Sequence, residues 1–177
     1  AEAEKAKALA EERQRLMRDM HDGVGGQLIT ALAALEGGKS APADVAQDII
    51  TKAQNALFLL HRSLDLAAIE AAVSFIAKAD MIYAFGSGGN SSMIADELQN
   101  RLFRLGLRIT ASSDHSMQLM MAAAARPGDV LIGSSFSGRN TELVRAFELA
   151  RQAKVKTIAL TQTASPVAKA AEIVVPI

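Results

Sequence analysis

A histidine and an aspartate stand side by side, as His21 and Asp22, in the segment RDMHDGVG near the start of the chain. An imidazole nitrogen can accept a phosphoryl group, and a neighbouring carboxylate can hold the proton on the other ring nitrogen. The apolar residues Met20, Val24 and Leu28 share one helix face, and this leaves the pair on the flank of that face. The pair could therefore act as a phosphoacceptor site, although a lone histidine on a helix surface usually has no chemical role.

A serine-rich segment, SSFSGRNTE at residues 134–142, is the second place where chemistry is expected. It follows an apolar, strand-like run and precedes a helical one. Ser135 and Ser137 each offer a hydroxyl group, and Gly138 permits a strained turn. The amides of residues 138–141 would point outward. These are groups that hold a phosphate, so the segment predicts an anion-binding loop.

A glycine-rich segment, FGSGGNSS at residues 85–92, ends the first apolar run in a similar way. Glycines let the backbone approach an anion closely, and the dipole of the following helix favours negative charge. A dinucleotide fingerprint is one alternative, but Ser91 occupies its third glycine position, and Asp114 lies 28 residues beyond Gly86 rather than about 20. A plain strand-to-helix turn is the other alternative. Two such loops in one parallel sheet open at the same edge, and that convergence favours a phosphate site.

The composition narrows the class of protein. The 177 residues include 19 basic and 19 acidic side chains, and this zero net charge disfavours non-specific binding to nucleic acid or to an anionic membrane. The absence of cysteine excludes a disulfide framework and a thiolate zinc site, and aromatic residues at 4% disfavour a base-stacking surface. No apolar run approaches the length of roughly 18 residues that spans a membrane, and the first residues lack the apolar centre of a signal peptide. We expect a cytoplasmic protein with no metal and no cofactor.

The first part of the chain has helical periodicity. One apolar stripe runs through residues 1–36, and a second runs from Val45 to Leu64. Between the stripes, GGKSAPAD combines a helix stop with Asp44 as the N-cap of the next helix. We predict a helical hairpin over residues 1–66 that pairs with a second copy, so that a homodimer contains a four-helix bundle. Packing of the hairpin on its own chain is the alternative.

The periodicity changes in residues 67–177. Short apolar, often β-branched runs alternate with helical stretches, which is the pattern of a parallel sheet covered by helices on both faces. We predict an α/β fold with a five-stranded parallel sheet of the doubly wound, flavodoxin-like type, whose binding edge lies at the carboxyl ends of the strands. The expected strands are 81–85, 107–112, 129–135, 156–160 and 172–176, and the expected helices are 67–78, 92–105, 116–125, 141–153 and 166–171.

This second part resembles the sugar isomerase (SIS) domain, in the form found in bacterial regulators of the ribose-phosphate-isomerase-repressor type. The resemblance rests on GSGGNSSMIADELQNRLFRLG and on the run from DVLIGSSFSGRNTELV to EIVVPI, and it covers residues 68–177. It implies a phosphosugar site with Ser91, Ser135 and Ser137 as phosphate ligands. The other ligand-binding residues predicted on the two loops are Gly88, Gly89, Asn90, Gly138, Asn140 and Thr141.

The sequence departs from this family in two places. A threonine of the family falls on Asn140, which would retune that contact, and the glycine turn is one residue longer. Beyond the fourth strand, Thr161 and Ser165 are either contacts at the rim of the site or a polar turn before Pro166.

An isomerase of this family needs a base near the sugar carbons. Glu142 and His115 are the local candidates. Glu142 also suits the first turn of a helix, where the dipole favours a carboxylate, and His115 also suits a loop or a cap. We therefore expect binding without catalysis, with a phosphosugar isomerase as the alternative.

The first part of the chain resembles the phosphoacceptor helix of sensor histidine kinases. The resemblance covers residues 11–35 and is most specific in RDMHDGVG. It implies that His21, as the phosphoacceptor, and Asp22 are catalytic residues, and that a histidine kinase or a response regulator is a partner. Gly26 stands where this subgroup often has a glutamine for phosphatase activity, and the chain contains no ATP-binding kinase domain, so it cannot phosphorylate itself.

Together these patterns predict a phosphosugar-binding regulatory module that takes part in transcription regulation. Its helical hairpin would supply the dimer interface, and this chain would contact neither a membrane nor nucleic acid. The alternatives are a phosphosugar isomerase and a structural or engineered fusion in which neither site is active.

Overall fold

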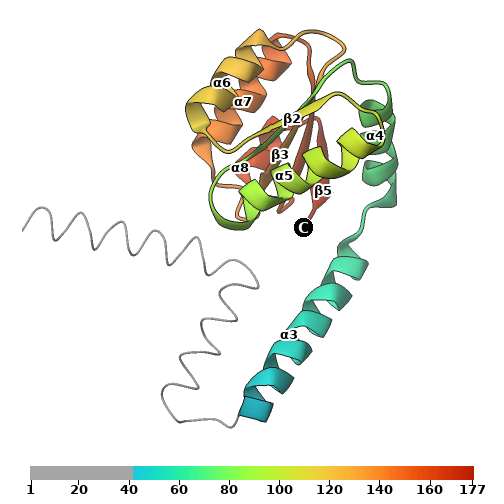
Figure 1. Cartoon of the computed structure of the whole chain (residues 1–177), viewed down its shortest axis with the longest axis vertical. Coiled ribbons are helices and arrows are strands. Elements are labelled where there is room, and N and C mark those ends of the chain that lie inside the picture. The colour runs from blue at the N-terminus through green and yellow to red at the C-terminus, as the bar shows by residue number, and fades with distance from the viewer. Residues whose placement is uncertain (1–41) are drawn as a thin grey trace, which may run out of the picture. The chain divides into compact units, whose positions relative to one another are not determined.

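Residues 42–177 are described by the computed structural model (Figure 1). Contacts within the chain divide it into two units, with the border between His61 and Arg62. The helix predicted within residues 1–36 lies outside the described residues, and so do His21 and Asp22. The phosphoacceptor site and the domain border after residue 66 therefore stay predictions.

Helix α3, Pro42–Ser63, belongs almost entirely to the first unit. Proline suits the start of a helix because its φ is already helical and its missing N–H would have no partner there. The predicted N-cap is wrong, since the helix begins two residues before Asp44 and this carboxylate lies in the first turn, where the dipole favours it. Asp48 and Lys52 form an ion pair one helical turn apart, with 2.6 Å between carboxylate and ammonium. The second helix expected from the apolar stripe is thus present.

The second unit is built on a five-stranded parallel sheet, which confirms the predicted fold class. Its strands are β1 (Ile82–Gly86), β2 (Ile109–Ser112), β3 (Val130–Ser135), β4 (Lys156–Thr161) and β5 (Ile173–Pro176). They lie in the order β2-β1-β3-β4-β5, so β3 is the central strand. The chain changes its direction of winding between β1 and β3, and doubly wound sheets bind ligands at such a switch point.

Helices cover both faces of this sheet (Figure 1). One face carries α4 (Leu66–Ala77) and α5 (Gly89–Arg104), and the other carries α6 (His115–Ala124), α7 (Thr141–Gln152) and α8 (Pro166–Ala170). Side-chain caps fix where four of the helices begin, since an oxygen of each cap accepts a hydrogen bond from a first-turn amide. The caps are Asp65, Asp114, Asn140 and Ser165. No helix among the described residues has the length and apolar character needed to cross a membrane.

Successive side chains along each strand point to opposite faces of the sheet and pack into two separate hydrophobic cores. Phe85 and Leu131 belong to the core beneath α6 and α7, together with the fully buried Phe147 of α7. Ile82 and Ile132 belong to the core on the opposite face. Burial of each such side chain contributes about 1.5–3 kcal/mol, and the strict alternation fixes the register of the sheet.

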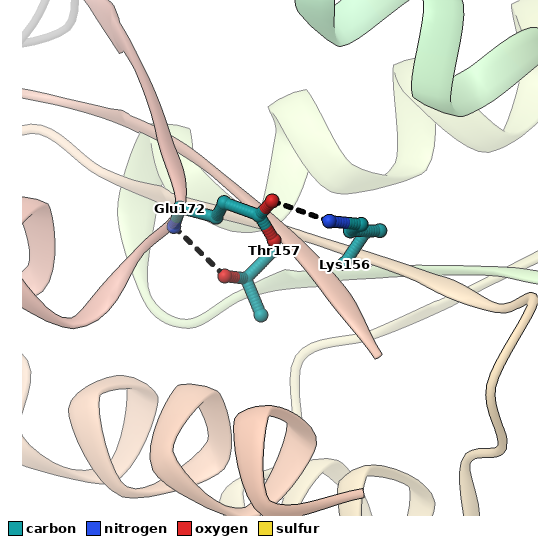
Figure 2. Close-up of polar contacts among 3 residues, drawn as sticks. All are labelled: Lys156, Thr157 and Glu172. Atoms are coloured by element: carbon teal, nitrogen blue, oxygen red, sulfur yellow. Dashed lines mark hydrogen bonds and ion pairs between the residues drawn. The ribbon is translucent and has the colours of Figure 1, made fainter. Parts of the chain in front are cut away.

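The edge strand β5 is fastened at its start by contacts with β4 (Figure 2). The amide of Glu172 donates to the hydroxyl of Thr157 at 2.9 Å, and the carboxylate of Glu172 pairs with the ammonium of Lys156 at 2.5 Å. The same ammonium lies 4.9 Å from the centre of the Phe75 ring of α4. The ion pair is about half exposed, so it contributes only about 0–1 kcal/mol. Thr157 is buried, and its contact with the main chain does more to place β5 beside β4.

The pKa of Tyr83 in β1 reports how far the helices on this face of the sheet exclude water from the ring. Its ring packs against the core beneath α6 and α7. Burial first, and then the negative charge of Asp129, raises the pKa of the phenol above its ordinary value of 10.0. The folded state therefore favours the neutral phenol, so this contribution to stability is present below pH 10.0 and is lost as the pH rises through the folded-state pKa.

A spectrophotometric titration at alkaline pH measures this shift directly, because Tyr83 is the one tyrosine in the sequence. We expect a higher midpoint in the folded chain than in the chain unfolded by urea. Equal midpoints would mean that the ring is as solvated in the sheet as in the unfolded chain.

Candidate functional site

The carboxyl ends of β1 and β3 bring two loops together at one edge of the sheet. Gly86, the last residue of β1, pairs with Ser134 of β3. The segments that leave β1 and β3, which begin with Ser87 and Ser135, therefore start from neighbouring positions in the sheet. The two loops that follow them open at the same edge and at the switch point of the sheet.

The loop after β1 is shorter than the sequence indicated. Gly88 is the N-cap of α5 with a φ of 72°, and the helix begins at the next residue, three positions before its predicted start. The predicted ligands Gly89, Asn90 and Ser91 therefore lie in the first helical turn and not in a loop. The physical reason is Gly86, where a Cβ would lie 1.9 Å from the main-chain oxygen of Ser91, so that the absent side chain lets the helix start directly on the strand. The amides of this turn form the positive end of a helix, which favours an anion.

The loop after β3 turns sharply into α7. Ser135 is buried, whereas Ser137 is exposed. Gly138 has a φ of 63°, and its amide donates to the main-chain oxygen of Ser135 at 3.1 Å. Asn140 caps α7, because its side-chain oxygen accepts a hydrogen bond from the amide of Leu143 at 3.0 Å. The oxygen of this predicted ligand is thus engaged in the cap, and its NH2 group is what it can offer to a ligand.

Two hydroxyl groups from the next strand and helix hold the β3–α7 loop from behind. The hydroxyl of Thr161 donates to the main-chain oxygen of Ser135 at 2.6 Å and lies 3.3 Å from the hydroxyl of Ser165. The amide of Val167 donates to the main-chain oxygen of Gly138 at 3.0 Å. We call this group of four residues the loop clamp. It consists of two residues of the loop end, Ser135 and Gly138, and the two residues that contact them, Thr161 and Ser165.

The loop clamp explains why residue 138 is glycine. Its positive φ is one reason, since side chains rarely adopt that conformation. The second reason is space, because a Cβ at Gly138 would lie 2.1 Å from both the Cβ and the hydroxyl oxygen of Ser165 and 2.7 Å from the hydroxyl oxygen of Thr161. The side chain of α8's cap therefore occupies the place that a side chain of residue 138 would need.

Ser165 lies in a turn directly before Pro166, as one interpretation of the sequence predicted, because its amide donates to the main-chain oxygen of Gln162 at 3.2 Å. Thr161 is the last residue of β4, and a contact of either residue with a ligand at the rim of the site stays a prediction. Thr161 is 0% exposed and Ser165 is 5% exposed. Their hydroxyls face the backbone of the loop, so they position the candidate ligands without being open to solvent themselves.

Ser134 contrasts with its neighbour in β3. Side chains alternate along a strand, so Ser134 and Ser135 point to opposite faces of the sheet. Ser134 is 2% exposed, and within the described part of the chain its hydroxyl is the one buried side-chain polar atom without a hydrogen-bond partner. A buried hydroxyl without a partner costs about 1–3 kcal/mol. It offers nothing to a ligand in the β3–α7 loop, which makes it a useful comparison for Ser135.

A polar cluster at the start of α6 was missed by the sequence analysis. The side-chain NH2 of Gln118, a residue that is 1% exposed, donates to the hydroxyl of Ser87 at 3.0 Å and to the main-chain oxygen of Ser112 at 2.8 Å. The hydroxyl of Ser87 lies 3.3 Å from Nδ1 of His115. The sequence did contain a signal for this cluster. Gln118 lies one helical turn before Ala122 on the buried face of α6, where an apolar side chain is expected.

The remaining candidates occupy the start of α7. Thr141 is its first residue and is exposed, and Glu142 lies in the first turn and is partly buried. The guanidinium of Arg139 is exposed beside them. Within residues 42–177 no cluster of three or more histidine or carboxylate side chains could hold a metal ion. The groups gathered at this edge are hydroxyls, amides and a guanidinium, which suit an anion that also carries hydroxyl groups.

Comparisons with known proteins agree with this chemistry. A family model described as the SIS domain matches residues 75–177. The chain is 33% identical over 146 residues to the HTH-type transcriptional regulator HexR of Pseudomonas aeruginosa, and the match covers 82% of this chain and 50% of the relative. The chain therefore spans about half the length of that relative. Because the match is longer than residues 75–177, it includes part of the chain that precedes the family model.

Solved structures show the same fold. The sugar isomerase domain of an RpiR transcription factor from Sphaerobacter thermophilus has a TM-score of 0.70 and 32% identity, with 74% of each chain covered. The Vibrio vulnificus NanR protein, complexed with ManNAc-6P, has a TM-score of 0.70 and 24% identity, with 82% of this chain and 54% of that chain covered. These proteins support the sugar isomerase resemblance. They give no support to the histidine kinase resemblance, which stays a prediction.

Substitution of Thr161 tests the loop clamp. Thr161→Val keeps the shape of the side chain and removes the hydroxyl, so we expect the free energy of unfolding to fall by about 1–2 kcal/mol through the lost buried hydrogen bond. The amide of Gly138 should also exchange its hydrogen faster, because its acceptor on Ser135 is no longer held. Urea denaturation and hydrogen exchange measure the two effects. Thr161→Ser is the control and should keep slow exchange, whereas equal exchange in the valine variant and the unsubstituted chain would show that the loop keeps its shape unaided.

Proposed function

The chain belongs to the SIS domain family, and we propose that its α/β unit binds a sugar phosphate as the ligand-sensing part of a transcriptional regulator. The observation that carries the proposal is the convergence of two serine-bearing loops at the switch point of the sheet, with the loop clamp behind one of them. A fixed set of hydroxyls and amides loses little conformational entropy on binding, which is what a ligand sensor requires.

The phosphate end of the ligand is assigned to the β3–α7 loop. Ser137 is exposed there, the hydroxyl of Ser135 borders the turn, and the amides at the start of α7 carry the positive end of the helix dipole. Arg139 adds a positive charge close to the turn. The first turn of α5, with Gly89, would approach the same ligand from the β1 side.

The regulatory part of the proposal comes from the relatives. HexR is an HTH-type transcriptional regulator, and the solved structure of NanR is a complex with ManNAc-6P. A sugar phosphate is the class of ligand that fits both the family and the chemistry of this edge. Such ligands are intracellular metabolites, so a sensor for them would act in the cytoplasm. Phosphoryl transfer at His21 forms no part of this proposal.

Helix α3 is proposed as a contact between two copies of the chain. Its side chains Ile50 and Leu57, two turns apart on one face of the helix, are 51% and 66% exposed, although both are large and apolar. Covering such a row of side chains is favourable by about 25 cal/mol per Å² of apolar surface removed from water. A second α3 would supply a matching surface, as the predicted four-helix bundle requires.

The first test of the proposal is a ligand screen followed by substitution in the β3–α7 loop. A thermal-shift screen against aldose and ketose phosphates, with ManNAc-6P among them, should raise the melting temperature of the chain. Ser135→Ala together with Ser137→Ala should weaken binding of the best ligand by about 2–5 kcal/mol in calorimetry, since each hydrogen bond to a charged group is worth roughly 1.5–3 kcal/mol.

Ser134→Ala is the matched control for this experiment. It removes a neighbouring hydroxyl from the same strand, but that hydroxyl faces away from the loop, so affinity should stay unchanged. Unchanged affinity in the double variant would contradict the phosphate assignment. Conversion of a sugar phosphate into its isomer by the chain would instead favour the isomerase alternative, with Glu142 or His115 as the base.

The dimer is tested by charge on α3. Ile50→Glu with Leu57→Glu places two carboxylates on the apolar row, and we expect the mass measured by light scattering to fall from that of a dimer to that of a monomer. Asn55→Glu adds a carboxylate to the opposite face of the same helix, at a residue that is exposed and already polar, and it should leave the mass unchanged. A dimeric mass for the double variant would place the contact elsewhere.

A further inference from the structure

Strand β2 lies at one edge of the sheet, so one side of its main chain faces no other strand. Within the described sheet it pairs with β1 alone. The amide of Ile82 in β1 donates to the main-chain oxygen of Arg108 at 2.8 Å, and every second residue of a parallel strand bonds to the same neighbour. Ile109 and Ala111 therefore direct their amides and carbonyls away from β1. Such an open row of polar groups is a template for a strand of another chain.

One of these two outward amides already has a partner on α5. The side-chain oxygen of Gln99 accepts a hydrogen bond from the amide of Ala111 at 2.5 Å. Neighbouring strands lie along the hydrogen-bonding direction, so this side chain occupies the position that the main chain of a sixth strand would take. Gln99 is partly buried there, whereas the next residue, Asn100, is exposed. The open side of β2 is thus closed by a residue of the helix that packs on the same strand.

The surroundings of this contact favour association of chains once it is lost. Phe103 follows Gln99 by one helical turn on the same side of α5, and its large apolar side chain is exposed. The net charge of zero provides no repulsion between copies of the chain. A two-fold axis beside β2 would bring the same edge of two copies together, so that each edge supplies partners for the other. A second copy of the chain is therefore the partner that this edge fits.

We infer that Gln99 protects the edge of β2 and so prevents two copies of the chain from joining their sheets. The side chain does this by occupying the amide of Ala111, which is a donor that the carbonyl group of an incoming strand needs. The inference is independent of the proposed function, because neither residue is among those assigned to the ligand. It is also separate from the proposed contact between copies through α3.

Substitution of Gln99 tests this protection. Gln99→Ala frees the amide of Ala111, so in dilute solution its hydrogen should exchange roughly 2- to 10-fold faster, which is the effect of one neutral hydrogen bond. In concentrated solution, light scattering should give a mass at least about twice that of the unsubstituted chain, because two sheets join. Gln99→Glu keeps an acceptor oxygen at the same place and should retain both the slow exchange and the mass. Asn100→Ala is the matched control on the same helix and should behave like the unsubstituted chain.

A second substitution tests whether the association uses β2. Ala111→Pro removes the outward amide itself, and proline is tolerated on an edge strand where its nitrogen faces away from the neighbouring strand. The double variant Gln99→Ala with Ala111→Pro should therefore return to the mass of the unsubstituted chain.

Three results would overturn the inference. Unchanged exchange of the Ala111 amide in Gln99→Ala would show that the side chain does not protect it. Faster exchange with an unchanged mass at every concentration would show that the edge does not associate when it is open. A raised mass in the double variant would place the association on another surface. If the alanine variant fails to fold, Gln99→Leu fills a similar space without an acceptor, and the same results are expected of it.

Discussion

Thr161 donates a hydrogen bond to the main-chain oxygen of Ser135 where solvent does not reach, and the shape of the β3–α7 loop depends on that contact. A parallel strand that ends in the middle of a sheet must turn away at once, and its last carbonyl needs a partner. Here the hydroxyl of Thr161 and the amide of Gly138 are the partners. Ser165 fills the space beside Gly138, so a side chain at residue 138 would collide with the N-cap of α8.

The hydrophobic periodicity of the sequence was sufficient to predict the five-stranded parallel sheet and the helices on its two faces. Strands buried on both faces read as continuous apolar runs, and the helices between them leave the sheet no arrangement but a parallel one. The prediction that both loops lie at carboxyl ends follows from chain direction alone. The start of α5 could not be predicted, because it depends on how closely the main chain of Ser91 approaches Gly86, and one sequence does not reveal that distance.

The support of the site escaped prediction for a related reason. Ser135 and Thr161 are 26 residues apart in the chain, and Ser87 and Gln118 are 31 residues apart, so no local pattern joins them. Serine and threonine in a loop look the same in sequence whether they face a ligand or a neighbouring backbone. Gln118 was the one visible sign, since a glutamine among core positions requires partners that are already in place.

The two polar networks at the carboxyl edge of the sheet come from different sides of the switch point. The loop clamp is made by β3, β4 and α8, whereas the cluster around Gln118 is made by β1, β2 and α6. A substitution in one network therefore leaves the contacts of the other intact. The two sides of this edge can accordingly diverge independently of each other in related chains, without loss of the fold that holds both.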